Sequence, residues 1–103
     1  MSILLVGGDR LGNITTKLRE SGFQNIGHIT GRKNGALKIK IPSNTDLILV
    51  LVDFISHKLT NVIKEESKRC YVKIAYSKRS WTYMEQTIRQ CVKEIEDSNL
   101  KQI

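Results

Sequence analysis

The stretch that most constrains the fold is the unbroken apolar run over residues 47–52, Leu-Ile-Leu-Val-Leu-Val, which ends at Asp53. Its length and β-branched content favour a strand over a helix. The lack of polar alternation predicts that both faces are covered, as in a parallel sheet flanked by helices. A Ser-His-Lys triplet at residues 56–58 then opens an amphipathic helical pattern. We therefore expect a buried strand that feeds a helix, with Asp53, Ser56 and His57 near any bound ligand.

Three further segments have the composition of short strands, at residues 3–6, 25–30 and 71–76, and they alternate with helical patterns. The first helical pattern ends near Gly22, the second covers residues 56–69, and the third follows residues 77–80. Their apolar stripes are Leu11, Ile14 and Leu18; Leu59, Val62 and Ile63; and Met84, Ile88, Cys91, Val92 and Ile95. This alternation predicts one α/β domain over residues 1–103, with a small four-stranded parallel sheet in the order 2-1-3-4 and helices on both faces.

Residues 36–42 break the alternation of strands and helices. Apolar side chains there alternate with Lys38 and Lys40, and Pro42 ends the pattern. A period of two residues predicts an exposed edge strand, or an extended segment lying across the sheet edge. The lysines would discourage edge-to-edge aggregation in either case, and contact with nucleic acid is the second interpretation of these residues.

A sheet in the order 2-1-3-4 has a switch point between its first and third strands. Ligands bind in such sheets outside the carboxyl ends of the strands, at that point. Four loops are expected to meet there. They supply the candidate site residues Gly7, Gly8, Asp9 and Arg10; His28, Arg32 and Lys33; Asp53, Ser56, His57 and Lys58; and Ser77, Lys78, Arg79 and Ser80.

The charge of the chain favours an anionic ligand at this edge. There are 17 lysines and arginines against 10 acidic residues, which gives a net charge of +7. The candidate loops hold basic residues in excess over the two acidic ones, Asp9 and Asp53, and a phosphate, a nucleotide or a carboxylated cofactor would suit them. The alternative is a basic surface that only aids solubility. The basic loop residues are Arg10, Arg32, Lys33, Lys58, Lys78 and Arg79.

The Gly7-Gly8 turn has two interpretations. Glycines let the backbone turn tightly and approach a ligand, and the following helix could present free N–H groups to an anion. However, the spacing Gly7-Gly8-x-x-x-Gly12 is neither the dinucleotide fingerprint nor a phosphate-binding loop with its Lys-Ser/Thr ending. A purely structural turn is the alternative.

Ser56, His57 and His28 also have structural and functional interpretations. Ser56 is expected to cap the helix that follows it. His57 would be the first residue of that helix, where the neutral imidazole keeps a lone pair for a metal, a haem iron or a proton. His28 can be a hydrogen-bonded structural residue or a ligand. The two cysteines, Cys70 and Cys91, lack metal-site spacing, and we expect ordinary thiols.

Parts of the chain resemble the small bacterial domain-of-unknown-function family 2325. They are Leu-Leu-Val-Gly-Gly at residues 4–8, His28 with Gly31-Arg32, and above all residues 45–50 with the following Asp53-x-x-Ser56-His57. The resemblance covers nearly the whole chain and implies a compact Rossmann-like domain, often oligomeric, without a settled activity. Many relatives have a His-x-Gly-Gly type sequence at the second strand end, from which this chain departs. A link to haem binding would make His57 and His28 the axial ligands.

Three classes of function follow from these observations. The first is a non-enzymatic module that binds or senses an anionic small molecule at the switch point. The second is a haem or metal protein that uses His57, with His28 or Tyr76 as a further ligand. A third is a nucleic-acid-binding accessory protein, in which Trp81 or Tyr83 stacks on bases beside the basic edge; core cover is the alternative for Trp81. Catalysis has the least support, because no Gly-x-Ser-x-Gly nucleophile elbow is present.

The sequence predicts neither a signal peptide nor a membrane span. The first residues lack the charged region and length of a signal peptide, and no stretch reaches the roughly 20 apolar residues of a membrane span. A cytoplasmic location is the expectation. Homo-oligomers, dimers or higher, are expected because a four-stranded sheet leaves its edges open.

Overall fold

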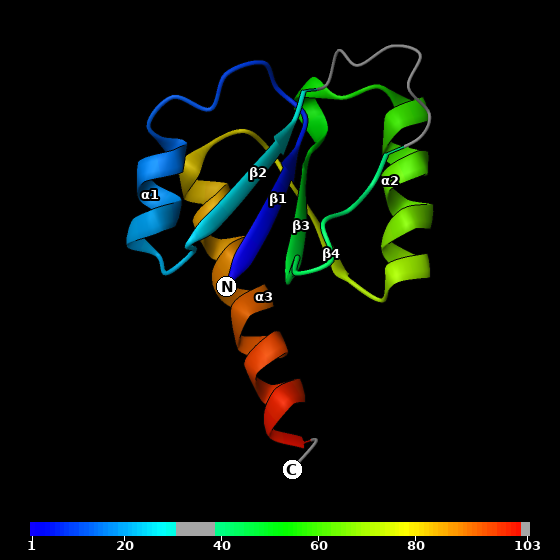
Figure 1. The fold of residues 1–103 in the computed structure, drawn as a ribbon. Coiled ribbons are helices and arrows are strands. Elements are labelled where there is room, and N and C mark those ends of the chain that lie inside the picture. Colours follow the sequence, from blue (N-terminus) through cyan, green and yellow to red (C-terminus); the bar gives the residue numbers. More distant parts are fainter. Residues whose placement is uncertain (31–38, 102–103) are drawn as a thin grey trace.

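The computed structural model describes residues 1–30 and 39–101, and it contains the α/β sheet that the sequence predicts (Figure 1). Four strands pair in parallel in the order β2-β1-β3-β4, which confirms the predicted order. The strands are β1 (Ser2–Val6), β2 (Asn25–Ile29), β3 (Leu47–Leu51) and β4 (Lys73–Ser77). The helices are α1 (Ile14–Glu20), α2 (His57–Cys70) and α3 (Trp81–Lys101), with a short 3-10 turn, η1 (Val52–Phe54), directly after β3.

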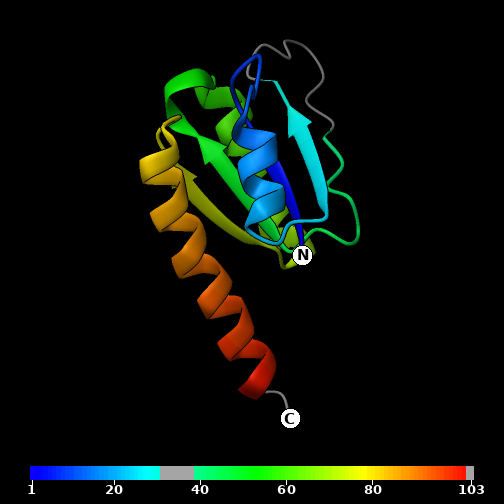
Figure 2. The ribbon, with the colours of Figure 1, turned by 90° about the vertical axis from the view of Figure 1, so that its left-hand side faces the viewer.

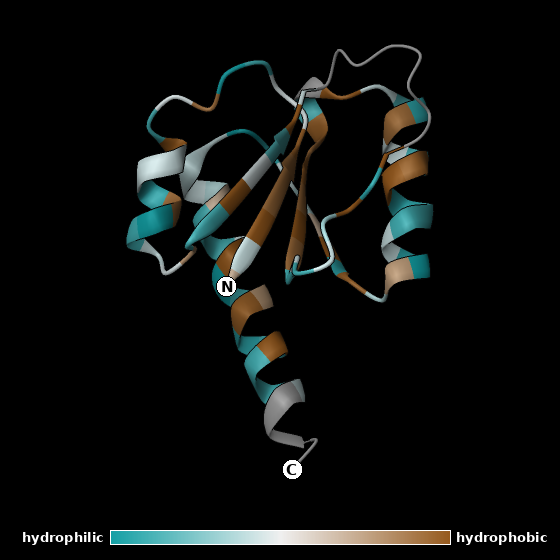
Figure 3. Ribbon diagram, viewed as in Figure 1, coloured by the Kyte–Doolittle hydropathy of each residue, from teal (hydrophilic) through white to brown (hydrophobic). Residues whose placement is uncertain are grey.

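β3 lies in the interior of the sheet and is buried on both faces, as its unbroken apolar sequence predicts. All five of its residues are fully buried. Because side chains alternate between the faces of a strand, Leu47, Leu49 and Leu51 enter one hydrophobic cluster and Ile48 and Val50 enter another. Figure 3 shows the same apolar colour along most of β1 and β3. Each such side chain contributes roughly 1.5–3 kcal/mol on burial.

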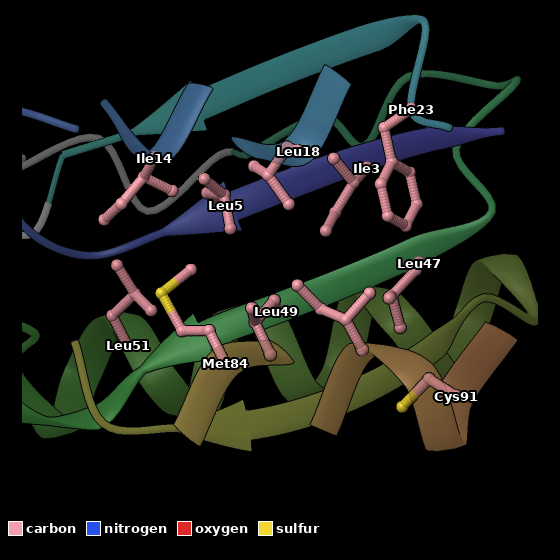
Figure 4. Packing of buried hydrophobic residues seen from close by; sticks show 11 residues of the cluster. Ile3, Leu5, Ile14, Leu18, Phe23, Leu47, Leu49, Leu51, Met84 and Cys91 are labelled. Atoms are coloured by element: carbon pink, nitrogen blue, oxygen red, sulfur yellow. The ribbon is translucent and has the colours of Figure 1, made fainter. Parts of the chain in front are cut away.

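The first face of the sheet is covered by α1 and α3. Ile14 and Leu18 of α1, with Phe23, pack over β1, and Met84, Ile88 and Cys91 of α3 complete the cluster (Figure 4). The stripes expected for the first and third helices are therefore the buried faces, although Leu11 precedes α1 and is only partly buried. Trp81 is partly buried against the same cluster, which confirms its role as core cover.

The second face is covered by α2 and by an extended segment, not by two helices. Leu59 and Ile63 of α2 pack over β3, while Ile39 and Ile41 pack in the same cluster as Leu4 and Val6 of β1. Figure 1 shows this segment on the same side of the sheet as α2. The predicted alternation is present, since Lys40 is exposed between the two buried isoleucines. The edge strand was wrong: the described part, residues 39–42, forms no strand, and its two isoleucines pack on a face of the sheet. Lys38 lies outside the described residues.

Two element boundaries differ from the prediction because of local backbone geometry. The helix expected near Leu11 begins at Ile14, after a longer loop behind the Gly7-Gly8 turn. The strand expected to start at Tyr71 starts at Lys73. Tyr71 itself adopts a left-handed conformation, with φ of 56°, and ends α2. Its side chain is almost completely exposed.

α3 begins at the carboxyl edge of the sheet and extends past the opposite edge (Figure 2). An ion pair between Lys73 of β4 and Glu94 of α3 joins the helix to the edge strand. Hydrogen bonding between these two side chains raises the pKa of Lys73 and lowers that of Glu94. The self-association expected from the open sheet edges stays a prediction.

The extended segment can be tested by truncating its two kinds of side chain. Ile41→Ala should lower the free energy of unfolding by about 2–4 kcal/mol, because it leaves a cavity in the cluster on the α2 side. Lys40→Ala, the matched control, should change it by less than about 0.5 kcal/mol. Urea-induced unfolding measures both values. Equal effects of the two substitutions would contradict the face-covering position.

The two thiols should differ in reactivity. Cys91 is buried on the sheet-facing side of α3, and this burial raises the pKa of its thiol. Cys70 is exposed at the end of α2. Because the thiolate is the reactive form, titration of the native protein with a thiol reagent at pH 8 should show one fast equivalent per chain. Cys91 should react only on unfolding. A fast phase that persists in Cys70→Ser would overturn this assignment.

Candidate functional site

The carboxyl ends of β1, β3 and β4 carry the loops in which most candidate residues lie (Figure 1). β3 stands between β1 and β4, so a side chain that joins the outer two loops must cross the end of β3. Arg32 and Lys33, which were expected after the second strand, lie outside the described residues.

The Gly7-Gly8 turn has a structural role that its backbone geometry makes visible. Both glycines are buried and have positive φ, 111° and 75°, a conformation that favours glycine. The Gly7 amide donates to the Ile29 carbonyl (2.8 Å), and the Gly7 carbonyl lies 3.0 Å from His28 Nε2. Gly7 therefore uses both of its backbone groups to hold the end of β1 to β2.

Arg79 joins the three loops at the switch point. Its guanidinium Nη2 donates to the carbonyl of Arg10 in the loop after β1, and its backbone amide donates to Asp53 Oδ2 after β3 (3.3 Å). The same side chain passes over Gly8: a Cβ at Gly8 would lie 3.6 Å from Arg79 Nε. The sequence placed Arg79 in the site but did not reveal this link, because contacts 69 and 26 residues apart in the chain leave no local pattern.

A hollow of about 310 Å³ lies beside this link, lined by Gly8, Asp9, Arg10 and Arg79. Asp9 and Arg10 are exposed, and Arg79 is half-buried. The hollow thus brings residues of the first and fourth loops together, and its described lining includes no residue of the loop after β3. Lys58 and Lys78 are exposed on neighbouring parts of the edge. Four described basic side chains, those two with Arg10 and Arg79, share this end of the sheet with Asp9 and Asp53.

Ser56 caps α2, as predicted. Its Oγ accepts a hydrogen bond from the Leu59 amide at 3.2 Å. His57 is the first residue of the helix and is exposed, as is Lys58. Ser56 and Asp53 therefore each have a structural partner in the backbone, the amides of Leu59 and Arg79.

His28 is half-buried on β2 and is oriented by its contact with the Gly7 carbonyl. If Nε2 carries the proton and donates to that carbonyl, Nδ1 keeps a lone pair. Within residues 1–30 and 39–101, no group of three or more His, Cys, Asp or Glu side chains could hold a metal ion. Haem ligation by His57 and His28 stays a prediction.

The loop after β4 is a compact turn that starts α3. Ser77 Oγ and the Ser80 amide both donate to the Lys78 carbonyl, at 2.9 Å each. The Ser80 carbonyl accepts from the Met84 amide at 2.9 Å, so Ser80 stands at the beginning of the helix. Lys78 Nζ lies over the ring of Tyr83, 5.4 Å from its centroid. The turn therefore presents Lys78 and Arg79 in different directions, toward Tyr83 and toward Gly8.

Comparison with known proteins identifies the family. Residues 2–91 match the family model DUF2325, described as an uncharacterized protein conserved in bacteria. That match runs from β1 to the middle of α3 and includes every candidate residue above. No curated protein and no solved structure matches the chain. Among the helices in the part of the chain that the structure describes, none is long and apolar enough to cross a membrane. Because the match covers most of its length, the chain belongs to the DUF2325 family of bacteria.

Proposed function

We propose that this protein is a non-enzymatic binding or sensing domain for an anionic small ligand, held at the carboxyl edge of the parallel sheet. The observation that supports the proposal most is the position of Arg79, which closes one side of the hollow beside Gly8 and Arg10. A guanidinium presents several N–H donors in a fixed plane that matches the geometry of a phosphate or carboxylate, which makes an arginine at this position suited to an anion.

Electrostatics support an anion over a neutral ligand. Arg10, Lys58, Lys78 and Arg79 lie at this edge in a chain of net charge +7. Positive charge at this edge attracts an anion and gives no such advantage to a neutral ligand. Asp53, one of the two acidic residues in these loops, accepts a hydrogen bond from the Arg79 amide and thereby holds the loop after β4 in place.

The backbone supports close approach of such a ligand. Gly8 is buried, has positive φ and carries no side chain between the turn and Arg79. The amide of Gly7 is already bonded to Ile29, so recognition is assigned to side chains and not to that amide. The N-terminus of α1 has no part in the proposal, because the helix begins at Ile14, six residues after Gly8.

The test is a thermal-shift panel of phosphorylated metabolites and nucleotides at low salt. A ligand that binds the native state raises the melting temperature in proportion to RT ln(1 + [L]/Kd). Arg79→Ala should weaken the best ligand about tenfold or more, because a hydrogen bond between charged groups is lost. Arg79→Lys keeps the charge but not the planar fork, and it should recover only part of the affinity.

Arg19→Ala is the matched control, since it removes the same charge from the exposed last turn of α1. It should leave the ligand-induced shift unchanged. An equal loss in Arg19→Ala would mean that only net charge matters. A panel in which no anion stabilises the wild-type protein would reject the proposed function.

A further inference from the structure

Exposed apolar side chains gather at the same edge of the molecule. Where side chains are described, the large exposed hydrophobic residues are Val52, Tyr71, Tyr76 and Tyr83, with 46%, 96%, 42% and 54% of their surface accessible. Val52 directly follows β3, Tyr76 is near the end of β4, and Tyr83 is in the first turn of α3. Three of the four therefore lie at the carboxyl edge. Each of the three offers exposed apolar surface at this end of the sheet.

Two of these residues flank the end of β4. Tyr76 pairs in register with Val50, whose side chain belongs to the cluster on the α2 side, so Tyr76 lies on that side of the sheet. Tyr83 is carried by α3, which covers the opposite side. The turn that carries Lys78 and Arg79 runs between them. We call Tyr76, Lys78, Arg79 and Tyr83 the β4 corner.

The contact between Lys78 and Tyr83 shows which chemistry the corner can offer. A lysine over an exposed ring is held only weakly, because water competes for the ammonium group. A planar group can therefore replace it on the ring. Lys78 would then turn to an anion attached to that planar group. Exposed aromatic rings beside basic side chains are one arrangement by which proteins hold single-stranded nucleic acid.

We propose that the β4 corner binds single-stranded nucleic acid, with a base stacked on Tyr83 and backbone phosphates on Lys78 and Arg79. The proposal goes beyond the small-ligand site: it shares Arg79 with the hollow but depends on Tyr83 and Lys78. An acidic peptide would satisfy the charges and leave the ring without a planar partner. Duplex DNA keeps its bases stacked inside the helix, so it cannot cover Tyr83 in this way.

The decisive comparison uses two ligands of equal charge on the full chain. A short thymidine oligonucleotide and an abasic oligonucleotide of the same length are titrated by fluorescence anisotropy at fixed salt. The thymidine strand should bind about tenfold more tightly, which is within the range for one stacked base. Duplex DNA and polyglutamate of matched charge serve as further competitors and should bind like the abasic strand. Equal affinity for all of these polyanions would overturn the proposal.

Variants then locate the stacking platform. Tyr83→Ala should remove the preference for thymidine over the abasic strand, whereas Tyr83→Phe should keep it, because the ring is retained. Tyr71→Ala is the control, since it removes an exposed tyrosine that follows the C-terminus of α2, far in the fold from the β4 corner. Lys78→Gln should weaken both strands and reduce the salt dependence by about one phosphate contact. A preference for thymidine that survives Tyr83→Ala would reject the role of Tyr83.

The outcomes also separate this proposal from the small-ligand function. Tyr83→Ala should leave stabilisation by the best small anion unchanged, and circular dichroism verifies that α3 is intact. If the small-anion panel fails while the thymidine preference holds, only the proposed function is rejected. If oligonucleotides fail and a small anion binds through Arg79, only the β4 corner is rejected.

Discussion

Burial of β3 on both faces is the constraint on which the rest of the structure depends. A strand without polar alternation cannot lie at a sheet edge or face water, so it needs a neighbour on each side and a cover on each face. β1 and β4 supply the neighbours. α1 and α3 cover one face, and α2 with residues 39–41 covers the other. All three helices and residues 39–41 therefore pack against β3 or the strands beside it.

The same constraint creates the site. Because β3 occupies the centre, the loops after β1 and β4 are separated by one strand, and Arg79 crosses that gap over Gly8 to reach the Arg10 carbonyl. Asp53, which follows β3, accepts a hydrogen bond from the Arg79 backbone amide, with 3.3 Å between the nitrogen and Oδ2. The anion-binding chemistry proposed for this edge thus depends on a side chain that is already placed by the fold, so less conformational entropy is lost on binding.

The candidate residues divide into those that hold the edge together and those that remain exposed at it. Gly7, His28 and Ser56 are engaged in hydrogen bonds within the fold. His57, Lys58 and Lys78 are exposed. This division is the reason why we assign stability to the turns and propose recognition by the basic side chains and the neighbouring tyrosines. It also explains how a sequence motif such as Ser56-His57 can resemble a catalytic cluster while its serine serves as a helix cap.

Much of the fold was determined by the sequence alone, because its signals are local. The apolar run at residues 47–52, the helical stripes and the Ser56 cap depend on neighbours in the chain, and the strand order followed from right-handed crossovers. Only the tertiary structure decided that Ile39 and Ile41 cover a face and not an edge. It also decided that Arg79 reaches Arg10 across β3 and that the exposed tyrosines flank β4. These contacts join residues far apart in the chain, and their energies depend on packing that no periodicity in the sequence encodes.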